Sequence, residues 1–502
     1  MTKSITSKIL ATVMLLTLLF AAIPTASAAT VDVLKTNQKV SISVKCDKPG
    51  YTFEMFKVAN LTSTEANPYK TEYISLVPEI SAEILAGDSQ NALSKLDKVK
   101  TLPATAVSQG TFASTATSTS KNFTNLDQGI YYIRCIKYPA NVTSVTNSII
   151  ALPYFNNGKW VYSYPSINLA AKVADTTVIT EKSITNSTKN NKNYTDVSLG
   201  DKVDFKLENT TAGSEQIKLK TYAVYDDMSA GLTLDKNSFV VTLADSKKEA
   251  LATLKKDTDY KINITSEAEG EHTTFNVALT PAYLAKSDFY AAEAKYLIVT
   301  YSAKLNSYAV RGSEGNPNED VKLEYGNDSA VDHVDGNEVD VYTYGIGVIK
   351  QDEAGTTLRG AKFELYKTLA DAESKTNAIG SGTSDINGYV TFKNADGEVL
   401  KLASGTYYIL ETAAPAGYSV YGSVITAEIP VTYNSVFTKG TWVQNAPNRG
   451  VLNITVTDTL VFFPKTGGYV GFIRTAGFAF IGLTVVLASA YLIRRKSAKT
   501  TK

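Results

Sequence analysis

Hydrophobic and polar residues alternate with a period of two in many short segments of the chain, a pattern typical of half-buried β-strands. Helical periodicity is scarce, and only residues 79–100 suggest one or two short helices, within an insertion. Tyr, with 30 residues, and Thr are abundant, and both favour strands. The pattern therefore predicts an all-β protein. The clearest alternating segments are residues 40–46, 130–135, 346–350 and 407–411.

The N-terminal segment has the three parts of a secretory signal peptide. Lys3 and Lys8 precede an apolar run at residues 9–23, and Ala26-Ser27-Ala28 supplies a small-residue cleavage site. We expect cleavage after Ala28, so that residues 1–28 are removed and the mature chain is exported.

A second apolar run, residues 476–493, lies near the C-terminus and is followed by Arg494, Arg495 and Lys496. It is long enough to span a hydrocarbon core of ~30 Å, and the basic residues favour a cytoplasmic end. The motif Phe463-Pro464-Lys465-Thr466-Gly467 precedes it. An ordinary membrane anchor after a chance Pro-Lys-Thr-Gly is the alternative interpretation.

The order of motif, apolar span and basic tail in residues 463–502 resembles the cell-wall sorting signal of Gram-positive surface proteins. That motif usually begins Leu-Pro-x-Thr-Gly, and here Phe463 replaces the leucine. The resemblance implies that sortase cleaves between Thr466 and Gly467 and joins Thr466 to a new amine. The protein would then be linked to peptidoglycan at the cell surface.

About 430 residues separate the two hydrophobic ends, too many for one core, so we expect about two to four domains. The net charge of +1 gives no reason to expect a nucleic-acid partner. His272 and His333 stand apart, and no cluster has the spacing of metal ligands. No nucleotide-binding or nucleophile motif is present either. A surface enzyme therefore lacks a site, and we expect no cofactor.

The segment 343–458 closely resembles the collagen-adhesin B-type domain, an immunoglobulin-like sandwich. The resemblance rests on Leu358-Arg359-Gly360-Ala361-Lys362-Phe363 and on the stretch Tyr407 to Thr412, which has the Tyr-x-x-x-Glu-Thr pattern of the pilin E-box. The segment 172–342 resembles the middle domain of backbone pilins from Gram-positive sortase-assembled pili. The segment 29–171 resembles these pilins more weakly. Together the resemblances imply three tandem immunoglobulin-like β-sandwich domains.

Lys350 and Glu411 lie at inward positions of their strands in the third domain. Burying two ionisable groups is costly unless they are paired or neutralised. The family implies a solution in which the lysine amine attacks an asparagine side-chain amide, the carboxyl group shuttles protons and ammonia leaves. Burial favours the neutral amine and the protonated acid. For the asparagine we expect Asn453, with Asn445 as a substitute. A simple ion pair between Lys350 and Glu411 is the alternative.

The matching residues of the second domain are Lys182, Asp226 and Asn318. Asp226 opens the family pattern Asp-x-Met-Ser-x-Gly-Leu. Surface charge on a turn is the alternative interpretation. The substitutes are Asp227 for the acid, and Asn306 or Asn327 for the amide.

The first domain has cysteines where the third has its lysine and glutamate. Cys135 occupies the place of Glu411, and Cys46 lies on the opening strand, where the third domain has Lys350. Both point inward by strand parity, and the exported chain has no other cysteine. We therefore expect a Cys46–Cys135 disulfide in place of an isopeptide bond. Two separate buried thiols are the alternative.

The leading hypothesis is a pilus shaft subunit that sortase polymerises through Thr466. The family usually places the acceptor lysine in Tyr-Pro-Lys, but here the motif is Tyr164-Pro165-Ser166. We expect Lys172 as the acceptor, with Lys159 as the alternative. The expected partners are pilin-class and housekeeping sortases, other copies of the chain, ancillary pilins and peptidoglycan. The second hypothesis is a wall-anchored adhesin or ancillary pilin that binds a host surface ligand and needs no acceptor lysine.

Overall fold

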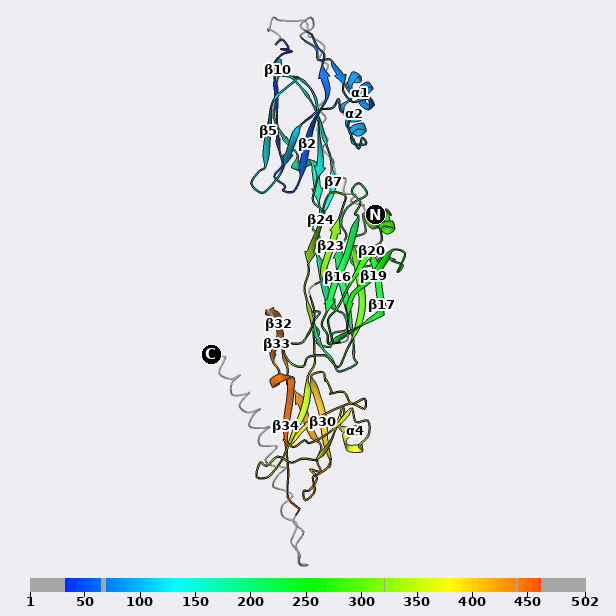
Figure 1. The fold of residues 1–502 in the computed structure, drawn as a ribbon, viewed down its shortest axis with the longest axis vertical. Coiled ribbons are helices and arrows are strands. Elements are labelled where there is room, and N and C mark those ends of the chain that lie inside the picture. The colour runs from blue at the N-terminus through cyan, green and yellow to red at the C-terminus, as the bar shows by residue number, and fades with distance from the viewer. Residues whose placement is uncertain (1–31, 65–68, 269, 320, 439–440, 462–502) are drawn as a thin grey trace, which may run out of the picture. The chain divides into compact units, whose positions relative to one another are not determined.

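The computed structural model describes residues 32–64, 69–268, 270–319, 321–438 and 441–461, and about half of these residues form strands (Figure 1). This confirms the predicted all-β class. The expected signal peptide, the sorting motif 463–467 and the apolar run 476–493 lie outside the described residues. Within the described ranges, no helix is long and apolar enough to cross a membrane.

The chain divides into two compact units. The first comprises the residues up to Ile346 together with Lys393–Thr406 and Ala427–Leu452, and the second comprises Gly347–Phe392, Tyr407–Thr426 and the chain from Asn453. The first unit contains two sandwiches, whose cores are built almost wholly from residues 40–173 and 178–341, respectively. We call these the N-terminal and middle sandwiches, and the sandwich formed by strands β26–β31 and β34 the C-terminal sandwich. The domain boundaries expected from the sequence stay predictions.

The N-terminal sandwich has a three-stranded sheet that faces a five-stranded sheet. The first has the order β11 (Ser163–Asn168), β1 (Val40–Lys45) and β5 (Ser120–Leu126). The second has the order β3 (Tyr73–Ser75), β2 (Thr52–Leu61), β6 (Gly129–Lys137) and β8 (Ser148–Leu152), with β4 (Ser108–Ala113) paired to β2. Two further pairs are β9 (Tyr154–Asn156) with β10 (Lys159–Val161), and β7 (Val142–Val145) with β12 (Val173–Asp175).

Strand β6 is buried on both faces because short helices cover the outer one. Tyr131 and Ile133 join the sandwich core, whereas Ile130 and Tyr132 pack with residues of the helices. The helices are η1 (Pro78–Ile80), α1 (Ser81–Ala86) and α2 (Ser89–Leu96), as expected for residues 79–100. Helices this short are only marginally stable in isolation, so packing against β6 stabilises them. The 3-10 helix η2 (Ala170–Lys172) follows β11.

The middle sandwich carries one candidate site between its two sheets. One sheet has the order β13 (Thr180–Ile184), β15 (Lys202–Thr210), β21 (Tyr296–Leu305), β17 (Leu232–Ala244) and β18 (Ala250–Thr253). The other has the order β14 (Tyr194–Asp196), β25 (Val339–Tyr342), β22 (Asn316–Asn318), β16 (Thr221–Met228), β20 (Thr273–Leu279) and β19 (Tyr260–Glu267). β23 (Lys322–Gly326) pairs with β16 and with β24 (Val331–Asp335), and the helices are α3 (Pro281–Leu284) and η3 (Asp288–Tyr290).

The C-terminal sandwich carries the second candidate site. Its sheets have the orders β29 (Tyr389–Thr391), β26 (Gly345–Asp352), β34 (Val451–Asp458), and β28 (Gly380–Thr383), β27 (Lys362–Tyr366), β30 (Gly405–Ala413), β31 (Ile425–Ile429). Helix α4 (Leu369–Ser374) follows β27. The hairpin β32 (Thr432–Thr438) with β33 (Thr441–Asn445), and η4 (Asn448–Gly450), belong to the first compact unit.

Candidate isopeptide sites

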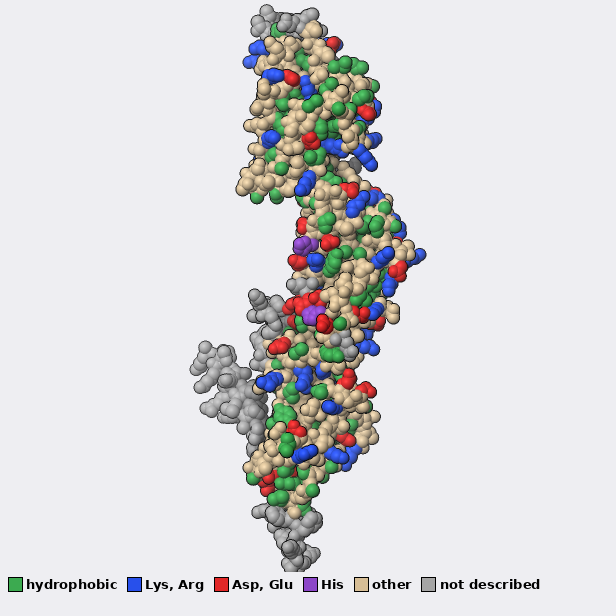
Figure 2. Space-filling view, in the orientation of Figure 1, with side chains coloured by type: hydrophobic (Ala, Val, Ile, Leu, Met, Phe, Trp, Pro, Cys, Tyr) green, Lys and Arg blue, Asp and Glu red, His purple; other side chains and the backbone are tan. Residues whose placement is uncertain are grey.

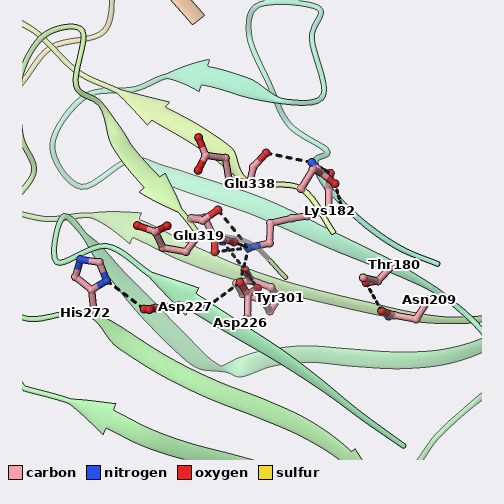
Figure 3. A network of polar contacts seen from close by, with 11 residues as sticks. Thr180, Lys182, Asn209, Asp226, Asp227, His272, Tyr301, Glu319 and Glu338 are labelled. Carbon is pink, nitrogen blue, oxygen red and sulfur yellow. Dashed lines mark hydrogen bonds and ion pairs between the residues drawn. The ribbon is translucent and has the colours of Figure 1, made fainter. Parts of the chain in front are cut away.

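Lys182 lies in the core of the middle sandwich, where its side chain is fully buried. Strand β13 supplies Lys182 from one sheet, and strands β16 and β22 supply Asp226 and Asn318 from the other. Lys182 Nζ lies 2.7 Å from Asn318 Oδ1. It makes a close ion pair with Asp226 Oδ1 (Figure 3). It also donates to the backbone oxygen of Glu319. The structure therefore brings together the lysine, acid and amide expected from the sequence.

The substitutes considered for the acid and the amide make other contacts. Asp227 turns to the partly exposed His272, with 3.2 Å between Oδ1 and Nδ1 (Figure 3). Asn306 donates to the Ala230 backbone oxygen, and Asn327 to that of Pro139. Asp226 and Asn318 are thus the side chains that meet the lysine.

Tyr301 is a member of this site that sequence reasoning missed. Its hydroxyl donates to Asp226 Oδ2 at 2.5 Å and accepts from Asn318 Nδ2 at 2.5 Å. The ring stacks on Phe205 at 5.1 Å between centroids and on Phe239 at 5.4 Å. Burial, reinforced by the charge of Asp226, raises the pKa of Tyr301 far above its usual value. The feature of the sequence that could have identified it is the inward position of Tyr301 on β21, a strand that faces the Asp226 strand, β16, across the core.

Lys350 lies in the core of the C-terminal sandwich, as strand parity predicted. Its Nζ lies 3.1 Å from Glu411 Oε2, and it makes a close ion pair with Asp458 Oδ1. All three side chains are fully buried. β26 and β34 are neighbouring strands, whereas Glu411 comes from β30 in the facing sheet.

Asn453, the expected partner of Lys350, does not lie beside it in the structure, and Asp458 takes that position. On β34 the buried positions are Val456 and Asp458, so Asn453, five residues before Asp458, points to the opposite, exposed face. Its Oδ1 lies against the backbone of Gly347. Asn445 lies on β33, outside this sheet. Reading the alternation from the end of β34 backwards would have selected Asp458.

Burial raises the pKa of Glu411, while the backbone N–H of Tyr421 and the charge of Lys350 oppose the rise. Tyr421 N donates to Glu411 Oε2 at 2.7 Å. Glu411 Oε1 and Asp458 Oδ2 are buried and accept no hydrogen bond from the described part of the chain. Two carboxylates against one ammonium would leave an uncompensated buried charge, which favours one protonated carboxyl. The site therefore presents an amine, an acid and an acyl group in contact.

The structure has two free thiols in the N-terminal sandwich instead of the expected disulfide. Cys46 and Cys135 belong to the same core, but each thiol donates to a backbone oxygen two residues further along the chain, Lys48 O and Lys137 O, both at 3.3 Å. Burial raises the pKa of Cys135 to about 12, so the thiol stays protonated and unreactive at neutral pH.

The expected acceptor lysines both lie in the N-terminal sandwich. Lys159 is exposed on β10, close to the turn that joins it to β9. Lys172 is partly buried at the end of η2, and its backbone oxygen accepts from Thr146 N. Tyr164-Pro165-Ser166 lies on β11.

Two family models match the chain. Residues 199–329 match the Gram-positive pilin backbone subunit 2, Cna-B-like domain, and residues 345–441 match the SpaA prealbumin-like fold domain. The first range includes Asp226, Tyr301 and Asn318, and the second includes Lys350 and Glu411. The chain thus carries one domain that matches the Gram-positive pilin backbone model and a second that matches the SpaA prealbumin-like fold model.

Among individual proteins, the trypsin-resistant surface T6 protein of Streptococcus pyogenes serotype M6 is 29% identical over 45% of this chain. The match spans 42% of that protein, less than half of its length. The solved T6 backbone pilin of serotype M6, described as a modular three-domain structure, aligns with 85% of this chain and 100% of its own at a TM-score of 0.52 and 17% identity. This likeness shows the fold. The major pilin SpaD of Corynebacterium diphtheriae covers the same share of this chain at a TM-score of 0.47 and 19% identity.

Basic and acidic side chains are interspersed on the face shown in Figure 2. This distribution agrees with the net charge of +1, and on that face the described residues form no broad basic patch that would suit a polyanion.

Proposed function

We propose that this protein is the structural shaft subunit of a covalent, sortase-assembled surface pilus, stabilised by an intramolecular isopeptide bond in each of two sandwiches. The observation that carries the proposal is the repeated arrangement of a buried lysine in contact with a carboxyl group and an acyl side chain. Burying a charged lysine and a charged carboxyl group away from water is costly. The arrangement becomes neutral once the amide forms.

In the middle sandwich, Lys182 Nζ attacks Cγ of Asn318, and Asp226 takes up the lysine protons. The 2.7 Å separation between Nζ and Oδ1 supports this role for Asn318. An amide forms and ammonia leaves. The bond joins β13 to β22 and so ties the two sheets together.

In the C-terminal sandwich, Lys350 forms its amide with Asp458, and Glu411 acts as the proton shuttle. Because the acyl group is a carboxyl, the leaving group is water instead of ammonia. The bond joins β26 to β34, the first and last strands of the sandwich. The chain between them is then shielded from a force applied to the two ends.

Polymerisation requires an acyl donor and an acceptor amine on the next subunit. Thr466 of the sorting motif supplies the acyl group, and Lys172 supplies the amine, with Lys159 as the alternative. Pilin-class sortase joins the subunits, housekeeping sortase attaches the finished polymer to peptidoglycan, and ancillary pilins join the same fibre. A signal peptide and a membrane-spanning sorting segment deliver the chain to the sortases.

The test is electrophoresis of wall extracts boiled in SDS. A shaft subunit gives a ladder of high-mass species, whereas an adhesin that is only anchored gives a single band, which would contradict the proposal. Thr466→Ala should abolish both the ladder and wall attachment. Lys172→Ala should leave monomer attached to the wall, and Lys159→Ala is its matched control. A ladder that survives in Lys172→Ala and disappears in Lys159→Ala would move the acceptor to β10.

A further inference from the structure

We propose that Tyr301 is a catalytic residue of isopeptide formation in the middle sandwich, where it carries a proton from Asp226 to the departing nitrogen of Asn318. The inference rests on the proposed Lys182–Asn318 bond. It assigns to this site a second acid–base group besides the carboxyl.

The Tyr301 hydroxyl lies between the acid and the leaving group. It lies 2.5 Å from Asp226 Oδ2 and 2.5 Å from Asn318 Nδ2, so it bridges the proton acceptor and the leaving group. Asp226 uses its other oxygen, Oδ1, for Lys182 Nζ. An unbroken hydrogen-bonded path therefore runs from the attacking nitrogen through the carboxyl and the phenol to the leaving nitrogen.

Loss of the amide nitrogen requires such a path. An amide nitrogen is a poor leaving group until it is protonated, and all four side chains are buried away from water. Within the described residues, the Tyr301 hydroxyl is the hydrogen-bond partner found for Asn318 Nδ2.

The Lys182 ammonium gives one proton to Asp226, and the resulting amine forms a bond to Asn318 Cγ. The electron pair of the attacked C=O bond moves onto Asn318 Oδ1. The protonated carboxyl then turns about its Cβ–Cγ bond so that its proton faces the Tyr301 oxygen, and the phenol turns its own O–H from Asp226 toward Nδ2. The new C–N nitrogen gives a second proton to the unprotonated oxygen of Asp226, while the carboxyl passes its first proton to Tyr301, Tyr301 passes its own to Nδ2, and the C=O bond forms again. The Cγ–Nδ2 bond then breaks, ammonia leaves, Tyr301 is unchanged and Asp226 ends protonated.

The surrounding aromatic rings hold Tyr301 in this position. Phe205 and Phe239 stack on its ring, and Phe275 packs edge-on at 5.1 Å between centroids. The high pKa of Tyr301 keeps its oxygen protonated, so the phenol passes protons without ionising in the resting protein. Strand β21 fixes the backbone between β15 and β17.

The C-terminal sandwich provides a contrast. Among the hydrogen bonds of its described residues, Glu411 contacts Lys350 and the Tyr421 backbone, and no tyrosine hydroxyl contacts Asp458. The site that would release ammonia therefore has a tyrosine hydroxyl at its leaving group, whereas the site that would release water has none among its described residues. A tyrosine substitution in the middle sandwich should leave the reaction at Lys350 unaffected.

The experiment measures the rate of bond formation in the ectodomain, residues 29–461, expressed in a host without sortase. Newly made protein is labelled by a short pulse of heavy lysine and sampled by acid denaturation, and the linked and unlinked Lys182 peptides are quantified by mass spectrometry. Tyr301→Phe, which keeps the ring, should slow formation at least tenfold, because acid–base groups contribute roughly 100-fold or more.

The matched control is Tyr222→Phe. Tyr222 is also fully buried in this sandwich, but its hydroxyl donates to the Thr210 backbone oxygen, outside the site. It should form the bond at the wild-type rate. Equal rates for Tyr301→Phe and wild type would overturn the role of Tyr301, whereas a wild-type protein without the bond would overturn the proposed bond itself.

A second variant covers the case in which Tyr301→Phe fails to fold, as judged by trypsin resistance. Replacing Tyr301 with 3,5-difluorotyrosine keeps the hydroxyl but makes it a stronger acid. If the phenol protonates the leaving nitrogen, formation should become several-fold faster. An unchanged rate would show that the hydroxyl only packs, and would contradict the proposal.

Discussion

Lys350 and Asp458 come from the first and last strands of the C-terminal sandwich, 108 residues apart, and their side chains meet in its core. Glu411 completes the contact from the facing sheet. In the proposed reaction, Asp458 is therefore the residue that accepts the lysine, and the molecule lost is water.

Asp458→Ala should abolish the water loss of the C-terminal sandwich, because the acyl group is gone. Without the cross-link, the sandwich should unfold more easily by ~4–5 kcal/mol, the loop-entropy value for a closure of this length. Peptide mass mapping and thermal unfolding of the ectodomain measure both effects. Asn453→Ala is the matched control on the same strand, and it should form the bond normally. A lost bond in Asn453→Ala would refute the assignment of Asp458.

Glu411→Gln should fold but leave Lys350 and Asp458 unlinked. The amide oxygen can still accept from Tyr421 N, yet it cannot carry protons between the amine and the acid. The expected product has the unreacted mass at this site, while the middle sandwich still loses ammonia. Mass mapping separates the two sites in one sample. Full bond formation in Glu411→Gln would exclude Glu411 as the shuttle.

The two cysteines should be free thiols in the folded protein. Unfolding the ectodomain in denaturant without reductant should allow iodoacetamide to alkylate both Cys46 and Cys135, whereas the native protein should react slowly because both are buried. Reductant should leave the thermal unfolding of the N-terminal sandwich unchanged. A denatured protein that takes up no label before reduction would contradict the structure.

The contribution of Asp340 to the stability of the middle sandwich should fall as pH rises. Burial, and then the nearby charge of Glu338, raise the pKa of Asp340 to about 7 from its usual 3.8. Between these values the folded state binds more protons than the unfolded state, so the contribution to stability is full below the lower value and is lost as pH rises through about 7. Asp340→Asn, which can still accept from Tyr342, should remove this dependence.

Thermal unfolding from pH 4 to pH 8 tests the role of Asp340. Relative to wild type, Asp340→Asn should gain stability toward pH 8, by an amount on the order of a few kcal/mol at most. A difference between the two proteins that stays constant across this range would show that Asp340 has no raised pKa.

Strand parity predicted the burial of Lys350 and Glu411, because each follows two inward residues on a regular strand. Asn453 was expected from the family pattern and not from parity, since the apolar residues Val451, Leu452 and Ile454 do not reveal which face of the strand is inward. The alternation at the end of β34, where Val456 and Asp458 share the inward face, was the usable signal, and the pairing of β34 with β26 brings Asp458 to Lys350.

The middle site shows a different limit of the sequence. Family motifs identified Lys182, Asp226 and Asn318, but Tyr301 joins them through the approach of two sheets, and no local pattern encodes such a contact. The cysteines show a third limit. Parity placed both in one core, but a shared core does not determine whether two thiols bond to each other or to neighbouring carbonyls.

The intact mass of the purified ectodomain tests the central claim, that two lysines form amides in the cores of two sandwiches. Residues 29–461 should weigh less than the sequence mass by one ammonia and one water, and Lys182→Ala and Lys350→Ala should each restore one of these losses. A loss of two ammonia molecules would contradict the assignment of Asp458. A mass equal to that of the sequence would contradict both bonds, and with them the account of a covalently stabilised shaft.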